Sequence, residues 1–124
     1  MSYESLLYFI ETSEFTKSWE KLGLNDEDDL LSLQLSIMAA PKRAPVVKGT
    51  GGLRKLRFAP PVWRTGSSGA VRVCYVYFDE YGIVLLVLVY AKGEKDNLSD
   101  EECAAIKRYI ARAKKELDRR KKPH

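Results

Sequence analysis

The clearest indication of the fold is the stretch VRVCYVYF at Val71–Phe78, followed by DEYG at Asp79–Gly82 and IVLLVLVY at Ile83–Tyr90. The first run is rich in β-branched and aromatic residues, which favour strands. The second ends in a glycine, as expected where a tight hairpin turn needs a positive φ. The third is apolar throughout, which is typical of a strand at the centre of a sheet. The stretch therefore predicts a β-hairpin in the middle of a sheet.

A further strand is predicted upstream of the hairpin, at 53–59. There Leu56 and Phe58 alternate with Lys55 and Arg57. Because successive side chains of a strand point to opposite faces, the apolar pair and the basic pair lie on different faces. The pattern predicts a strand with a basic outer face.

The N-terminal third predicts a strand and two helices. The apolar run Leu6–Ile10 lacks helical spacing and indicates a buried or edge strand. A short helix follows, with Ser13 as a candidate N-cap and Gly23 as its stop. Asn25 precedes a cluster of acids that favours a second helix N-terminus, and Pro41 ends that helix.

The C-terminal part predicts a long helix. Ser99 and Glu102 have the spacing of a capping box, and apolar residues follow at helical spacing. The other face of this helix is basic, which fits a solvated face better than a binding surface. Together the patterns predict an α+β fold in one domain, residues 1–124, with 119–124 as a basic tail. We expect an antiparallel sheet whose two N-terminal helices and C-terminal helix pack on one face and leave a basic face open.

The charge of the chain is unevenly distributed. The net charge is +4, but residues 1–41 carry −6, whereas residues 42–75 carry +8 and no acid. Clustered Lys and Arg attract phosphates, which suggests a polyanionic ligand for the middle segment. The alternative is that these bases pair with the acidic N-terminal third.

Several classes of protein are disfavoured. With one histidine, at position 124, a histidine base, a Ser–His triad or a zinc site is nearly excluded, so we expect neither a metal nor a cofactor. Cys74 and Cys103 fit a reduced compartment. No Lys or Arg precedes the first apolar run, as a signal peptide would require, and the run 83–91 is too short to span a bilayer. These features predict a cytoplasmic protein with no membrane partner.

Basic and aromatic residues recur on neighbouring predicted strands. Phosphates bind Arg and Lys, and bases stack on aromatic rings, so a sheet face that carries both is a candidate platform for single-stranded RNA. Core packing is the alternative role of the tyrosines. Arg72 stands among apolar neighbours and needs a carboxylate partner or a phosphate ligand if it is buried. The set comprises Lys48, Arg54, Lys55, Arg57, Arg72, Lys92 and Lys95, with Tyr75, Tyr77 and Tyr90 between them.

Three motifs in this region carry a family resemblance. They are VVKGTGGLRKLR at 46–57, GAVRV at 69–73 leading into a tyrosine-rich strand, and YAKGEKDNLS at 90–99. As a set they resemble the RelE/HigB family of bacterial toxins, and the HigB-like branch in particular. The resemblance implies a RelE-like domain within the RelE/ParE superfamily.

The resemblance also implies a function. Such proteins are toxins of type II toxin–antitoxin systems and act as ribosome-dependent mRNA endonucleases, or mRNA interferases. Cleavage needs no metal, because the ribose 2′-OH attacks the adjacent phosphate. The implied partners are the ribosome, mRNA and a cognate helix-turn-helix antitoxin encoded nearby, which holds the toxin inactive.

Site residues follow from the same resemblance. Arg57 and Arg72 are expected to bind the phosphate, and Lys55 or Lys92 to act as the base, which makes these four the candidate catalytic residues. Strict alternation points Arg54 toward the helices, where it could instead brace an acid. The candidate RNA-binding residues are Lys48, Arg54, Arg64, Tyr90 as a stacking group, and Lys95.

Two other functions remain open at this point. One is a toxin without nuclease chemistry, as in the related ParE branch that inhibits DNA gyrase. The other is a degenerate module that binds RNA or an antitoxin. Three cations converging on one phosphate favour the nuclease, because an inhibitor that binds a protein has no need of them.

Overall fold

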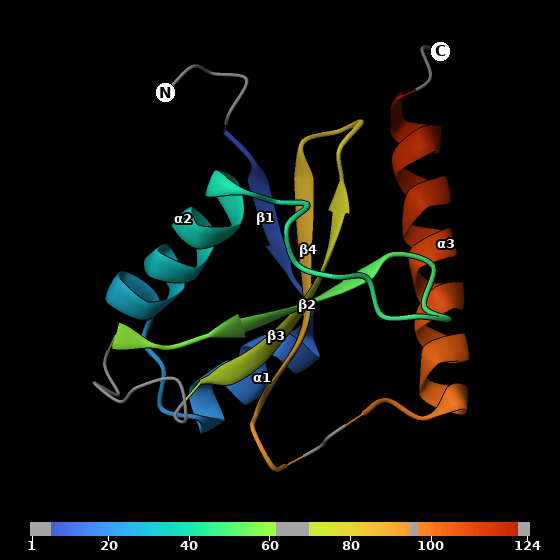
Figure 1. Ribbon diagram of the computed structural model, residues 1–124. Helices are drawn as coiled ribbons and strands as arrows, with labels where there is room; N and C mark the ends of the chain where they lie inside the picture. Colours follow the sequence, from blue (N-terminus) through green and yellow to red (C-terminus); the bar gives the residue numbers. More distant parts are fainter. Residues whose placement is uncertain (1–5, 62–69, 95–96, 122–124) are drawn as a thin grey trace.

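A computed structural model of the protein describes residues 6–61, 70–94 and 97–121. These residues form a four-stranded sheet with helices on both of its faces (Figure 1), and the predicted α+β class is confirmed. In chain order the elements are β1 (Tyr8–Glu11), α1 (Ser13–Lys21), the π-helical turn η2 (Asp26–Leu30), α2 (Leu31–Ala39), β2 (Leu53–Phe58), β3 (Val71–Phe78), β4 (Ile83–Ala91) and α3 (Asp100–Lys121).

The predicted hairpin of β3 and β4 forms the middle of the sheet. Its turn is closed by the Tyr81 N–H, which donates to the Phe78 carbonyl at 3.0 Å, and Gly82 adopts a φ of 64°. The strand order is β1-β4-β3-β2, so the continuously apolar β4 has a neighbour on each side. The apolar run therefore identified a central strand correctly.

The sheet is mixed rather than antiparallel throughout. β1 pairs with β4 in parallel, with Tyr8 opposite Ile83 and Glu11 opposite Leu86, whereas β3 is antiparallel to both β2 and β4. The pattern of apolar residues does not determine this difference, because alternation is the same in either direction. The long connection from β1 to β4 permits the parallel arrangement.

Side-chain caps start the two N-terminal helices. Thr12, one residue before the predicted Ser13, caps α1, where its hydroxyl oxygen accepts from the Phe15 N–H at 3.0 Å. Asn25 is the cap that the sequence predicted, and its Oδ1 accepts from the Asp28 N–H at 2.8 Å. The first turn after this cap is π-helical and then continues as α2.

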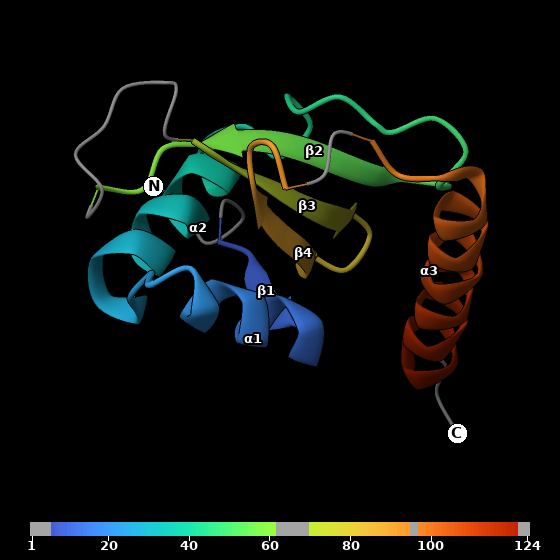
Figure 2. The same ribbon diagram turned by 90° about the horizontal axis from the view of Figure 1, so that it is seen from below.

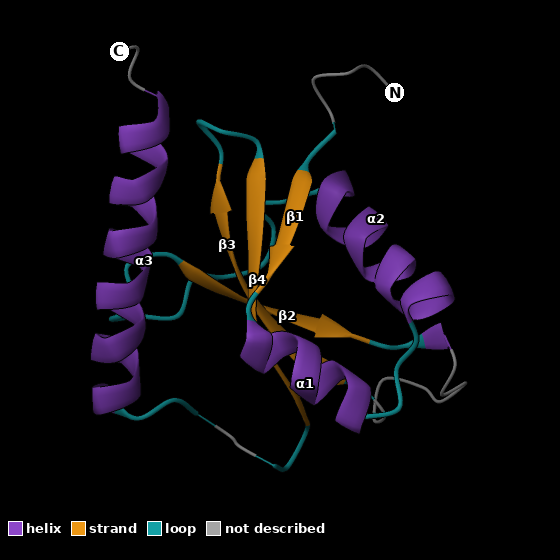
Figure 3. Cartoon of the chain, turned by 180° about the vertical axis from the view of Figure 1, so that it is seen from behind, coloured by secondary structure: helices purple, strands orange, loops and turns teal. Residues whose placement is uncertain are grey.

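The helices lie on both faces of the sheet, so the prediction that all three pack on one face is wrong. α1 and α2 cover the face where Phe15 and Leu33 are fully buried. α3 lies at the opposite face (Figures 2 and 3). There Ile110 packs with Val76 and Leu85. The physical reason is that β3 and β4 are apolar on both sides, and each side needs a cover.

The glycine-rich loop before β2 packs against α3. The buried Thr50 hydroxyl donates to the Val47 carbonyl at 2.6 Å and accepts from the Leu53 N–H at 3.0 Å. Gly51 has a φ of 76°, and a Cβ there would lie 3.2 Å from Cγ of Lys107. Glycine therefore lets the loop pass close to the helix.

The predicted capping box begins α3. The Ser99 N–H donates to the Glu102 carboxylate at 2.9 Å, and the Glu102 N–H donates to the Ser99 hydroxyl at 3.1 Å. The 22-residue helix then runs to Lys121, so the first residues of the predicted basic tail are helical. Within the described ranges, no helix is both long and apolar enough to span a membrane.

Candidate functional site

Three cations of the sheet come together on the face that α3 also occupies. Lys55 and Arg57 lie on the same side of β2 as Leu53, which belongs to the core on the α3 side. The antiparallel register places Arg57 directly opposite Arg72 and Lys55 opposite Cys74. We call Lys55, Arg57 and Arg72 the basic cluster.

The cluster is partly exposed to solvent. The Arg57 side chain is exposed, whereas Lys55 and Arg72 are half-buried. Within the described part of the chain, Nη1 of Arg72 is the one buried side-chain nitrogen or oxygen without a hydrogen-bond partner. A buried cationic donor without a partner costs about 1–3 kcal/mol or more, so this nitrogen is suited to an anionic acceptor that the described residues do not provide.

Cys74 and Tyr90 form the floor next to the cluster. Burial raises the pKa of the Cys74 thiol to about 11, with the Lys55 charge acting in the opposite direction. Burial, with a smaller contribution from Cys74, raises the pKa of the Tyr90 hydroxyl to about 12. Both groups are therefore neutral at physiological pH. Tyr90 lies opposite Arg72 on the neighbouring strand. Because it is only 7% exposed, it offers little ring surface on which an RNA base could stack.

An acid from α3 borders this floor. The Glu102 charge contributes to the raised pKa of Tyr90, whereas the Arg72 charge lowers it, so both groups lie close to the Tyr90 hydroxyl. Sequence reasoning assigned Glu102 only to the capping box and did not include Cys74 in the site. The sequence does contain an indication of both. Cys74 is two residues after Arg72 on one strand and so shares its face, and Glu102 is in the first turn of the helix that covers this face.

Two other candidate residues lie outside the basic cluster. Lys92 is exposed in the turn that directly follows β4. Lys48 is exposed and lines a pocket of about 660 Å³ between the glycine-rich loop and the first turns of α3, together with Lys107. Arg64 and Lys95, also predicted to bind RNA, are outside the described residues.

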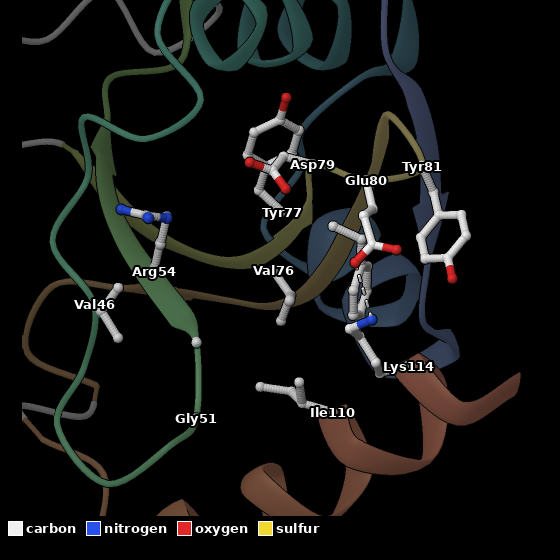
Figure 4. A pocket seen from close by; sticks show the side chains of 12 residues that line it. Val46, Gly51, Arg54, Val76, Tyr77, Asp79, Glu80, Tyr81, Ile110 and Lys114 are labelled. Atoms are coloured by element: carbon white, nitrogen blue, oxygen red, sulfur yellow. Dashed lines mark hydrogen bonds and ion pairs between the residues drawn. The ribbon is translucent and has the colours of Figure 1, made fainter. Parts of the chain in front are cut away.

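Arg54 lies on the opposite side of β2, as strict alternation predicted. Its Nη1 donates to the carbonyls of Lys42 and Ala44 at 2.9 and 2.8 Å, so it braces the backbone before β2 and not an acid of the second helix. It also lines a pocket of about 240 Å³, in which Val76 and Ile110 face one another (Figure 4). The structure therefore separates Arg54 from the basic cluster.

The described residues contain no group of three or more His, Cys, Asp or Glu side chains that could hold a metal ion. The groups assembled at the site are instead three cations, a neutral tyrosine and a neutral thiol. Such a set can bind a phosphate and stabilise additional negative charge on it.

Comparison with solved structures identifies the fold, whereas no protein-family model matches the chain. The helices and the mixed sheet define an α+β domain of the kind found in bacterial RelE toxins. A variant of the E. coli toxin RelE in the free state, with two arginines replaced by alanine, is 21% identical, with a TM-score of 0.52 over 72% of this chain and 85% of that chain. The isolated E. coli RelE toxin is 23% identical, with a TM-score of 0.50 over 83% of this chain and 98% of that chain. This chain therefore has the RelE fold.

Proposed function

We propose that this chain is the toxin of a type II toxin–antitoxin system and that it cuts mRNA on the ribosome as a HigB-like mRNA interferase. The RelE fold supports the toxin class. The motifs around Lys55, Arg57 and Arg72 support the finer placement, because the fold brings these three residues onto one face of the sheet.

One observation carries the proposal: the buried, unpartnered Nη1 of Arg72 beside Arg57. Arginine binds phosphate through two parallel N–H groups, and a second cation on the neighbouring strand can bind another oxygen of the same group. A surface that binds only protein gains nothing from a half-buried guanidinium with an empty donor position. An RNA phosphate provides the missing acceptor.

The chemistry follows from the three side chains. Lys55 takes the proton of the ribose 2′-OH, and the 2′ oxygen attacks the adjacent phosphorus. The bond between phosphorus and the 5′ oxygen breaks as the new bond forms, and the departing 5′ oxygen takes a proton from water, which leaves a 2′,3′-cyclic phosphate and a 5′-hydroxyl end. Arg57 and Arg72 stabilise the charge on the pentacoordinate phosphate. Lys55 is a better candidate base than Lys92, because it shares its face with both arginines.

The proposed partners are the ribosome, mRNA and a helix-turn-helix antitoxin encoded nearby, and the proposed location is the cytoplasm. The net charge of +8 in residues 42–75 supports an RNA partner, since such a segment attracts phosphates. The acids of the N-terminal third lie largely on α1 and η2, on the face away from the basic cluster.

The test is to express the wild type, Arg72→Ala and the matched control Lys17→Ala, and then to map transcript ends. Lys17 is an exposed cation on α1, on the opposite face of the sheet. We expect cuts within translated regions for the wild type and the control, and none for Arg72→Ala. Growth arrest with intact transcripts and inhibited DNA supercoiling would instead assign the protein to the gyrase inhibitors. Intact transcripts and normal growth would indicate a binding module without nuclease activity.

A further inference from the structure

The strand β1 forms one edge of the sheet, and its outer side has no partner strand among the described residues. The Tyr8 N–H donates to the Gly82 carbonyl at 2.8 Å, and the Thr12 N–H donates to the Leu86 carbonyl at 3.0 Å. In a parallel pair, alternate residues bond to the same neighbour. The N–H and C=O of Phe9 therefore point away from β4, toward the open edge.

This edge is unusually apolar. Tyr8 is 68% exposed and Ile10 is 39% exposed, and both lie on the face that α3 occupies. Edge strands of soluble monomers are normally protected by charges, prolines or bulges. Here the charge, Glu11, comes only at the end of the strand.

The apolar surface extends from the edge into a groove of about 210 Å³ between the sheet and α3. Ile10 lies at its border, and Tyr109, on the helix side, is 37% exposed. The other apolar lining comes from Phe78, Ile83, Leu85, Ala113 and Leu117. The edge and the groove thus form one continuous surface, which is typical of a protein interface.

The pattern on β1 is self-complementary. Tyr8 and Ile10 stand symmetrically on either side of Phe9. If two such strands pair antiparallel about a two-fold axis at Phe9, the Phe9 backbones exchange hydrogen bonds and each Tyr8 lies directly opposite Ile10 of the other copy. Aromatic and β-branched residues are favourable cross-strand pairs. The same axis places Glu11 opposite Leu7 of the other copy, so the two acids do not face each other.

We propose that two copies of this chain associate through antiparallel pairing of their β1 strands, with Tyr8 of each copy against Ile10 of the other. The result is one continuous eight-stranded sheet. β2 is at the other edge of each sheet, so both basic clusters remain open in the dimer. The inference does not depend on the proposed nuclease function.

The test is sedimentation velocity over about 1–200 μM protein, with variants that change the charge of the edge. We expect wild type to dimerise, and Tyr8→Lys to weaken the dimer about tenfold or more, because the substitution acts twice in a symmetric pair. The matched control is Leu35→Lys, at a leucine that is 49% exposed on α2, and we expect it to remain dimeric. Circular dichroism checks that every variant is folded.

The double variant Tyr8→Lys/Ile10→Glu tests the register. The two introduced groups have opposite charge and face each other across the two-fold axis, so we expect the dimer to re-form at low ionic strength. A wild type that is monomeric at every concentration would overturn the proposal, and would leave the edge to a strand from a different protein. So would dissociation by Leu35→Lys alone, or a failure of the double variant to restore the dimer.

Discussion

Two charged regions of the same protein differ in how their charges are paired. At the β3–β4 turn, the Tyr81 hydroxyl donates to the Asp118 carboxylate, and Lys114 Nζ lies 3.2 Å from the same group. The Glu80 carboxylate forms ion pairs with Lys114 Nζ at 3.4 Å and with Lys121 Nζ at 3.8 Å. We call these five residues the turn cluster. In the basic cluster, by contrast, Arg72 keeps a buried nitrogen without a hydrogen-bond partner.

This difference separates charges that stabilise the fold from charges that are available to a ligand. In the turn cluster, each acid and each lysine finds its partner within the chain, and the group ties α3 to the hairpin. In the basic cluster, Arg72 stands in register opposite Arg57 and keeps one buried nitrogen without a hydrogen-bond partner among the described residues. The turn cluster is complete within the chain, whereas Arg72 has a donor left for a ligand.

The largest expected effect comes from Arg72→Met, which replaces the guanidinium side chain by an unbranched apolar one. We expect RNA cleavage to fall by about 10²–10³-fold, as for the loss of a positioned stabilising group. The melting temperature should be unchanged or higher, because a buried donor without a partner is removed. Cleavage kinetics and thermal unfolding on the same sample measure both, and a large loss of stability would show that Arg72 holds the fold.

A smaller effect concerns the neutral floor of the site. Because the pKa of Cys74 rises from 9.0 in the unfolded chain to about 11, the folded state holds the thiol proton more tightly. This contribution to stability is complete below about pH 9 and is lost as the pH rises toward 11, at about 1.4 kcal/mol per pH unit. Urea unfolding between pH 8 and 10.5 should show the decline in wild type. Cys74→Ala should flatten it, whereas the control Cys103→Ala should retain it.

Arg57→Ala tests the basic cluster through the salt dependence of RNA binding. Arg57 is exposed, so we expect it to contribute one phosphate contact without affecting the fold. The slope of log affinity for single-stranded RNA against log salt concentration should decrease by about 0.7. Fluorescence anisotropy at several salt concentrations measures this slope. Lys17→Ala should leave it unchanged, and an equal decrease in that control would indicate a diffuse attraction to the whole protein.

Much of this fold could be predicted from the sequence, because its signals are local. The apolar run of β4, the Asn25 cap and the Ser99 capping box each depend on neighbouring residues, and all three are confirmed. The arrangement of the helices is not local. Because β3 is apolar on both sides, each face of the sheet needs a helix packed on it. The strand pattern does not predict which helix packs on which face.

The same division applies to the site. Alternation along β2 predicted that Lys55 and Arg57 share one face and that Arg54 lies on the other. The structure has the three side chains on these faces. The register between strands brings Arg57 opposite Arg72, and this depends on the full hairpin and loop geometry. The burial of Tyr90 under α3 also depends on long-range packing, which a strand pattern cannot reveal.

The smallest effect is expected in the turn cluster, and it completes the contrast with Arg72. The hydrogen bond from Tyr81, followed by that from Lys114, lowers the pKa of the Asp118 carboxyl. A lowered folded-state pKa stabilises the protein above the unfolded value of 3.8, and this contribution is lost as the pH falls through the folded value. Asp118→Asn should therefore lower the melting temperature at pH 7 by a few degrees at most, since the pair is exposed and screened by salt.

RNA cleavage by Asp118→Asn should equal that of wild type, because the turn cluster and the basic cluster border opposite ends of α3: Glu102, beside Tyr90, is in its first turn and Asp118 in its last. Sixteen residues of helix separate them by about 24 Å. Thermal unfolding at pH 7 and pH 3, together with cleavage assays, distinguishes the two regions. If Asp118→Asn abolished cleavage while the protein stayed folded, the turn cluster would matter to function as much as the basic cluster, and the contrast between the two clusters would not hold.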